Sequence, residues 1–266
     1  MNFRATVAFP GNIPPSVQQV STAQLITALP RNLNKVAHLD NLPFVGFDLW
    51  RCFDLSWLNG QGKPVVAIAE FMIPATSPNV IGSQSFKRYL GSFNQSTFES
   101  VNDIAAILAR DLSLAAGEEV NVKICPEPDL YSDPVYTPSA KCIDYLDISI
   151  VSHDFKPQYL IDAAGHKYVS ETLSSNLLKF NRPDVNLTGW GQVFINYEGR
   201  KIEREKLLRY IISFGAYNGS CECCVERIFK DIEQYCHPVN LSVFARYTRA
   251  GGIDIMPFRS NFKNYP

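Results

Sequence analysis

The chain has 266 residues and is 46% hydrophobic, which is enough for one large domain or two small ones with buried cores. Its formal net charge of -1 gives no electrostatic basis for binding nucleic acid or an anionic membrane. No apolar run reaches the length of a membrane span, and residues 1–15 lack the basic start and apolar stretch of a signal peptide. We therefore expect a cytoplasmic protein, and its odd number of cysteines, 7, suits reduced thiols.

Hydrophobic patterning predicts two successive groups of strands and helices. In each group, a strand that alternates β-branched or aromatic residues with smaller or polar ones precedes a pair of helices, and further strands follow. The expected strands are residues 64–73, 119–125, 144–151, 191–197, 241–248 and 253–258, and the expected helices begin near Ile81 and Ile202 and span 101–114 and 223–235.

These two groups form an internal repeat. Residues 81–93 align without gaps with residues 202–214, and the alignment pairs an isoleucine, an Arg-Tyr dipeptide and a Ser-Phe dipeptide at identical spacing. Two consecutive units of strand, helix pair and strand predict an α+β architecture, with helices on one face of an antiparallel sheet.

The sequence Leu-Leu-Lys-Phe-Asn-Arg-Pro at 177–183, followed by Gly-Trp-Gly at 189–191, resembles the active-site segment of the NADPH-dependent 7-cyano-7-deazaguanine reductases. These enzymes are the nitrile reductases of queuosine biosynthesis. Further matching segments occur in order along most of the chain, at 40–44, 55–60, 85–95, 204–210, 224–229, 245–249, 251–252 and 259–261.

The resemblance implies the tunnelling fold, in which modules of antiparallel sheet join into a barrel and a helix pair on one face of each module covers the outside. We assign residues 1–151 to an N-terminal module, 152–167 to a linker and 168–266 to a C-terminal module. Ligand pockets of this fold lie between modules or subunits. The resemblance therefore also implies a homodimer that binds a small heterocyclic molecule.

The chain departs from the family at the reaction centre. In the family, the residue after the asparagine is the cysteine that attacks the nitrile carbon, and the residue before the tryptophan is an aspartate that handles its proton. These positions are Arg182 and Gly189 in this chain. Because a guanidinium cannot form a thioimide and glycine cannot transfer a proton, we expect nitrile reduction by the family mechanism to be absent.

The positions that the resemblance assigns to the cofactor are also altered. The family signature Glu-Ser-Lys-Ser reads Gly-Ser-Gln-Ser at 82–85, and the second arginine of an Arg-Arg-Gly-Gly run is Ala250. The phosphates of NADPH need cationic groups, so we expect binding of this cofactor to be weakened. The matching residues that remain are Ser83 and Ser85 for substrate binding and Lys87 and Arg249 for cofactor binding.

Glu222 matches the family glutamate that holds the amidine-like edge of the deazaguanine. A carboxylate accepts two parallel N–H bonds from such an edge, so this residue favours a heterocycle-binding pocket. The alternative interpretation is an acidic residue that the helix dipole favours in the first turn of a helix.

Two residues are candidates for replacement chemistry. Cys221 replaces the pocket histidine of the family, and the nearby helix start could lower its pKa and make it a nucleophile; the alternative is an inert helical thiol. Arg182 could bind a carboxylate or phosphate, or it could point into solvent at a dead site. The spacing of Cys221, Cys223 and Cys224 does not favour a zinc site, so we expect no metal.

Three functions therefore remain open. The first is an enzyme repurposed for a related nitrogen-rich ligand, with Glu222 as its anchor. The second is a non-catalytic binding or partner subunit. The third is an NADPH-dependent nitrile reductase with a rearranged site. The altered reaction centre disfavours the third, and we favour the first.

Overall fold

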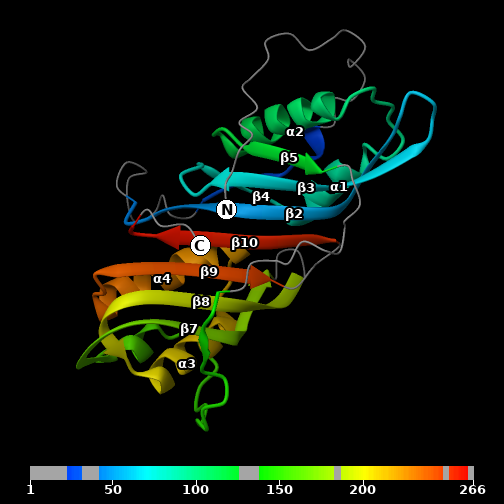
Figure 1. Ribbon diagram of the computed structural model, residues 1–266. Coiled ribbons are helices and arrows are strands. Elements are labelled where there is room, and N and C mark those ends of the chain that lie inside the picture. The colour runs from blue at the N-terminus through cyan, green and yellow to red at the C-terminus, as the bar shows by residue number, and fades with distance from the viewer. Residues whose placement is uncertain (1–22, 32–41, 126–137, 183–186, 248–251, 263–266) are drawn as a thin grey trace. The chain divides into compact units, whose positions relative to one another are not determined.

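The computed structural model describes residues 23–31, 42–125, 138–182, 187–247 and 252–262. Within these ranges the protein has an α+β fold with mostly antiparallel strands and four α-helices. The chain divides into two compact units (Figure 1). Unit 1 comprises Met1–Asn34, Leu49–Pro134 and Ala250–Ile253, and unit 2 comprises Lys35–Asp48, Val135–Arg249 and Asp254–Pro266.

Unit 1 combines three neighbouring strands, in the order β5-β3-β2, with a helix pair. Its elements are β1 (Ala28–Pro30), β2 (Val45–Leu58, which begins in unit 2), β3 (Pro64–Pro74), β4 (Asn79–Ile81), α1 (Ser83–Gly91), α2 (Val101–Ala116) and β5 (Asn121–Cys125). Strand β1 pairs antiparallel with β4, and β3 pairs antiparallel with β5. The ring of Phe86 on α1 packs edge-on against Trp50 of β2 and Phe71 of β3, with centroids 5.0 Å apart in both contacts. Helix α1 therefore covers one face of this sheet.

Unit 2 has five neighbouring strands in the order β10-β9-β8-β7-β6. Its elements are β6 (Lys141–Cys142), the 3-10 helix η5 (Pro157–Leu160), β7 (Ala164–Arg182), β8 (Leu187–Ile202), α3 (Arg204–Ser213), α4 (Cys221–Cys236), β9 (Asn240–Tyr247) and β10 (Ile253–Ser260, which begins in unit 1). Strands β7 and β8 form a long antiparallel pair, and β9 pairs antiparallel with β8 and with β10. Helices α3 and α4 lie on the same face of these strands (Figure 1).

Local sequence signals explain where the helices begin and end. The hydroxyl of Ser220 accepts a hydrogen bond from the backbone N–H of Cys223 and caps the start of α4, and Ser100 caps α2 in the same way. Gly117 ends α2 with a φ of 79°, a left-handed conformation that glycine adopts without strain. None of the helices in the described ranges is both long enough and apolar enough to cross a membrane.

Most of the predicted elements are confirmed. The predicted helices correspond to the four α-helices, and five of the predicted strands lie within or largely overlap β3, β5, β8, β9 and β10. The predicted strand at 144–151 is wrong. Only Lys141 and Cys142 pair with β7, and the chain then turns, with the N–H of Leu146 donating to the carbonyl of Ile143. Alternating hydrophobicity at 144–151 therefore occurs without a paired strand among the described residues.

Two long strands, β2 and β7, were not predicted. Both carry polar residues at positions that are buried in the fold, such as Asp48 and Arg51 in β2 and Ser174 and Ser175 in β7. These residues interrupt the alternation of apolar and polar residues that identifies a strand from sequence. The segment expected to link two modules, residues 152–167, contains η5 and the first residues of β7 and belongs to unit 2.

The internal repeat extends to buried hydrogen bonds. The hydroxyl of Tyr89 on α1 donates to Asp111 on α2 at 2.9 Å, and the aligned Tyr210 on α3 donates to Asp231 on α4 at 2.8 Å. Each carboxylate also pairs with an arginine, at 2.8 Å in both units. Burial, and next the neighbouring carboxylate, raises the pKa of both phenols above the ordinary range, so both remain hydrogen-bond donors. The same contact therefore joins the two helices of each unit.

Helix α4 is also held by a fully buried arginine of β10. Arg259 contacts the carboxylates of Asp48 at 2.7 Å and Glu226 at 2.6 Å, and the exposed fractions of these three side chains are 0%, 2% and 3%. A buried charge is costly unless it is paired, so these contacts require one position of α4 relative to β10 and to the start of β2 within unit 2.

We predict that Tyr89→Phe and Tyr210→Phe each lower the free energy of unfolding, because each change removes one donor from a buried carboxylate. The expected loss is about 1–3 kcal/mol for each variant, measured by urea denaturation. Tyr145→Phe is the matched control, because Tyr145 is 92% exposed and its substitution should change stability little. Tyrosine variants as stable as the wild type would show that these contacts do not hold the helix pairs.

Candidate functional site

The β7–β8 hairpin carries both altered positions of the reaction centre. Gly189 pairs with Phe180 in the strand register, and Arg182 pairs with Leu187 at the end of the hairpin. The backbone of Arg182 is described, but its side chain lies outside the described part of the structure, so its two interpretations stay open.

The position of the family aspartate is filled by an aromatic ring. A Cβ added at Gly189 would lie 2.4 Å from Cε1 of Phe180, which is closer than any real contact of this kind. Phe180 is 5% exposed and packs edge-on against Tyr247 of β9, with ring centroids 5.2 Å apart. The ring of Phe180 is therefore confined, and glycine is the residue at 189 that this packing accommodates.

The same aromatic pair connects the hairpin to the start of α4. The hydroxyl of Tyr247 donates to the backbone carbonyl of Cys221 at 3.3 Å. A Cβ at Gly191 would lie 2.6 Å from the Tyr247 ring, so the second glycine beside Trp190 admits this ring. The roles of Phe180 and Tyr247 were not predicted from the sequence. The two glycines that flank Trp190 were the sequence feature that could have indicated aromatic rings packed against this strand.

A second connection joins the end of β7 to the loop before α4. The N–H of Gly219 donates to the carbonyl of Asn181 at 3.2 Å, and the side chains of Asn181 and Asn218 are 3.4 Å apart. Because Asn181 precedes Arg182 and Gly219 precedes the cap of α4, these bonds bring the backbone at Arg182 close to the turn that carries Glu222. Unit 2 therefore brings together three of the predicted positions: 182, 221 and 222.

Glu222 lies in the first turn of α4 and is 2% exposed. Its charge contributes to raising the pKa of the neighbouring groups Cys221 and Tyr247, after the larger effect of their burial. The first turn of a helix favours a carboxylate through the helix dipole, and an ionised carboxylate accepts hydrogen bonds.

The thiol of Cys221 is buried rather than activated. Burial raises the pKa of Cys221 well above its ordinary value, and the charge of Glu222 raises it further. Cys224, one turn along the helix, is shifted in the same direction for the same main reason. The lowered pKa that would make Cys221 a nucleophile is therefore absent, which favours the interpretation of an inert helical thiol.

The predicted residues of α1 come together in unit 1. Ser83 is the first residue of α1, and the hydroxyl of Ser85 accepts from the N–H of Thr27 at 2.9 Å and donates to the carbonyl of Gly82 at 2.7 Å. Ser85 therefore holds the segment before β1 against the helix start. Arg249 and Ala250 lie outside the described residues.

The lysine of α1 that the resemblance assigns to NADPH binding is already paired. The ammonium of Lys87 is 2.5 Å from the carboxylate of Asp54, and the position of the family lysine holds the exposed, neutral Gln84. A cation already paired with a carboxylate offers less to a phosphate than a free one. As for metals, no group of three or more histidine, cysteine, aspartate or glutamate side chains within the described ranges is arranged to hold an ion.

Two family matches cover most of the chain. Residues 18–124 match the nitrile reductase family described as 7-cyano-7-deazaguanine-reductase N-term, and residues 188–265 match the family of QueF-like proteins. The first match contains α1 and its serines, and the second contains Gly189, Glu222 and the buried Arg259.

We predict that Gly189→Asp destabilises the protein by about 1–3 kcal/mol, because the new side chain must displace the buried Phe180 ring. Phe180→Ala alone should cost about 3–5 kcal/mol through the cavity that it leaves. In the Phe180→Ala background, the aspartate should cost less than in the wild type, a coupling of about 0.5–3 kcal/mol measured by urea denaturation of the four proteins.

Gly91→Asp is the control for this cycle, because a Cβ at Gly91 meets nothing within 4 Å. Additive effects of Gly189→Asp and Phe180→Ala would contradict the role assigned to Phe180.

We also predict that iodoacetamide modifies Cys125, Cys142 and Cys223 before Cys221 and Cys224, because the first three thiols are half-buried and the last two are buried. The thiolate is the reacting form, so alkylation of Cys221 should remain slow as the pH passes the ordinary thiol pKa of about 8.5. Mass spectrometry of peptides at several pH values measures the order. Early modification of Cys221 at neutral pH would show an activated thiol instead.

Proposed function

The chain belongs to the 7-cyano-7-deazaguanine reductase family, and we propose that it binds a guanine-like or related nitrogen-rich heterocycle without reducing nitriles through a thioimide. The observation that carries this proposal is the buried carboxylate of Glu222 in the first turn of α4, beside a reaction centre filled by Phe180.

The anchoring half of the site supports ligand binding. Glu222 is held in place because its helix is fixed by the Glu226–Arg259 ion pair one turn later and by the Tyr247 bond at Cys221. A carboxylate positioned in this way can accept two parallel N–H bonds from an amidine-like edge, and the low-dielectric surroundings strengthen such bonds.

The reacting half of the site argues against nitrile reduction. A thioimide needs a thiolate at the nitrile carbon, and the family position holds Arg182. Cys221 is adjacent to the anchor in sequence, but burial opposes formation of its thiolate. Gly189 offers no group to move a proton, and Phe180 occupies the space that such a group would need.

We favour an enzyme repurposed for different small-molecule chemistry. In this proposal Glu222 orients the ligand, and Arg182 and Cys221 contribute new pocket groups. The family resemblance also assigns Ser83 and Ser85 to substrate binding. Arg182 would bind an anionic group of the ligand, because a guanidinium offers several donors in a fixed plane. The protein would act as a homodimer, as its family resemblance implies, and in the cytoplasm, as its sequence composition leads us to expect.

Two alternatives have specific support. A non-catalytic binding or partner subunit is favoured by the burial of the Cys221 and Cys224 thiols on α4, which raises the pKa of both. A nitrile reductase of queuosine biosynthesis with a rearranged site is favoured by the family matches themselves. A measurement of ligand turnover distinguishes the binding subunit from the two enzymes, because only an enzyme converts its ligand.

We predict that the wild-type protein does not reduce 7-cyano-7-deazaguanine with NADPH, because the nucleophile and the proton acceptor of the family are absent. NADPH absorbance and mass spectrometry of the products measure the reaction. Stoichiometric NADPH oxidation with formation of the aminomethyl product would contradict the proposal and show that the protein is a nitrile reductase with a rearranged site.

We predict that Glu222→Gln lowers the affinity for guanine or a 7-deazaguanine by tenfold or more, because a charge-assisted pair of hydrogen bonds, worth about 1.5–3 kcal/mol for each bond, is replaced by a neutral contact. Isothermal titration calorimetry measures the affinity. Glu233→Gln is the matched control on the same helix and should bind like the wild type. Unchanged affinity of Glu222→Gln would place the ligand elsewhere.

A further inference from the structure

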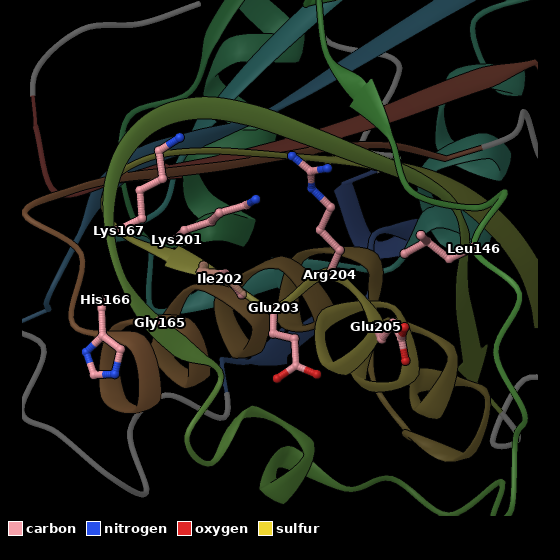
Figure 2. Close-up of a pocket in the computed structure, with 9 residues that line it drawn as sticks. All are labelled: Leu146, Gly165, His166, Lys167, Lys201, Ile202, Glu203, Arg204 and Glu205. Carbon is pink, nitrogen blue, oxygen red and sulfur yellow. The ribbon is translucent and has the colours of Figure 1, made fainter.

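A separate cavity of about 430 Å³ lies in unit 2, at the end of the β7–β8 pair opposite to Arg182. It is lined by the start of β7, the end of β8 and the first turn of α3 (Figure 2). Cavities of a few hundred cubic ångströms hold small molecules in many proteins. The proposed function uses none of the residues that line this cavity.

A β-bulge shapes the cavity. Ala164 pairs with Ile202 and Tyr168 pairs with Arg200, so three residues of β7 lie opposite one residue of β8. Gly165 and Lys167 belong to this bulge, and Lys201 is the residue opposite. Bulges turn side chains away from the regular alternation of a strand and occur often beside functional sites.

The basic side chains of the cavity point into the same space. Figure 2 shows the charged ends of Lys167, Lys201 and Arg204 on one side of the helix start, whereas the carboxylates of Glu203 and Glu205 point to the other side.

The acidic groups at the rim are neutralised by other bases. Glu203 pairs with Lys206 at 3.3 Å, and Glu205 pairs with Arg209 at 3.4 Å. Within the part of the chain that the structure describes, neither Lys167 nor Lys201 has a carboxylate at ion-pair distance. The cavity therefore has a local excess of positive charge in a protein whose net charge is -1.

Arg204 is held in place by an ion pair, and one of its N–H groups has no hydrogen-bond partner among the described residues. Its Nη2 donates to Glu171 at 2.9 Å, and the other oxygen of Glu171 accepts from the hydroxyl of Tyr197 at 2.8 Å. The Nε of Arg204 is buried and has no hydrogen-bond partner among the described residues. A buried donor without a partner is unfavourable, so a ligand oxygen that reached the Nε would stabilise the arginine in this position.

We propose that this cavity binds the phosphate group of a small phosphate monoester. Lys167 and Lys201 supply charge, and Arg204, oriented by Glu171, supplies a third cationic group. A tetrahedral dianion has enough acceptor oxygens for all three groups, and the cavity is larger than phosphate alone, so it has room for the attached organic group. Binding at this cavity does not depend on the function proposed for the α4 site.

The test is isothermal titration calorimetry of the full chain with inorganic phosphate, and with ribose 5-phosphate against ribose, at constant ionic strength. We expect one saturable site for both phosphates and none for ribose. Lys167→Ala and Lys201→Ala should each lower the association constant by roughly tenfold, as expected for loss of a charge-assisted hydrogen bond.

Lys141→Ala is the matched control, because Lys141 is an exposed lysine of the same unit that does not line the cavity. It should bind phosphate like the wild type. Lys167 and Lys201 are exposed, so their variants should keep the fold, which circular dichroism verifies. Absence of saturable binding at millimolar phosphate, or an equal loss in Lys141→Ala, would overturn the proposal.

Discussion

The buried ion pairs of Arg259 are the constraint on which the second unit depends. A guanidinium with no exposed surface is stable only when carboxylates neutralise it, and here Asp48 and Glu226 supply them. Glu226 lies one turn after Glu222 on α4, so the pairing that makes the core possible also fixes the residue that we propose as the ligand anchor. The Tyr210–Asp231 bond adds a second fixed contact farther along the same helix. Helix α4 therefore carries both the buried contacts that stabilise unit 2 and the carboxylate that we propose as the ligand anchor.

Packing as well as residue chemistry sets the character of the position that the resemblance assigns to the family aspartate. Gly189 lacks a proton-transferring group, and the Phe180 ring occupies the space next to it and packs against Tyr247. Tyr247 in turn binds the backbone of Cys221, whose thiol is buried. A substitution at 189 therefore meets a neighbouring ring that fits the present glycine.

The sequence predicted the features that depend on local periodicity. Helix positions, several strands and the repeat all follow from spacing, and the aligned Tyr89 and Tyr210 even make equivalent hydrogen bonds. Features that depend on distant partners could not be predicted. The strand β2 contains the buried Asp48, whose partner Arg259 is far away in sequence. Within the described ranges, no strand pairs with the alternating segment at 144–151. The pKa of Cys221 depends on burial, which its position at a helix start does not reveal.

The most direct test of the account is a crystal structure of the protein soaked with 7-cyano-7-deazaguanine. We predict an intact nitrile, no covalent bond to any cysteine, and the amidine-like edge of the heterocycle within hydrogen-bond distance of the Glu222 carboxylate. A carbon–sulfur bond between the ligand and a cysteine, or a ligand bound away from Glu222, would contradict the account.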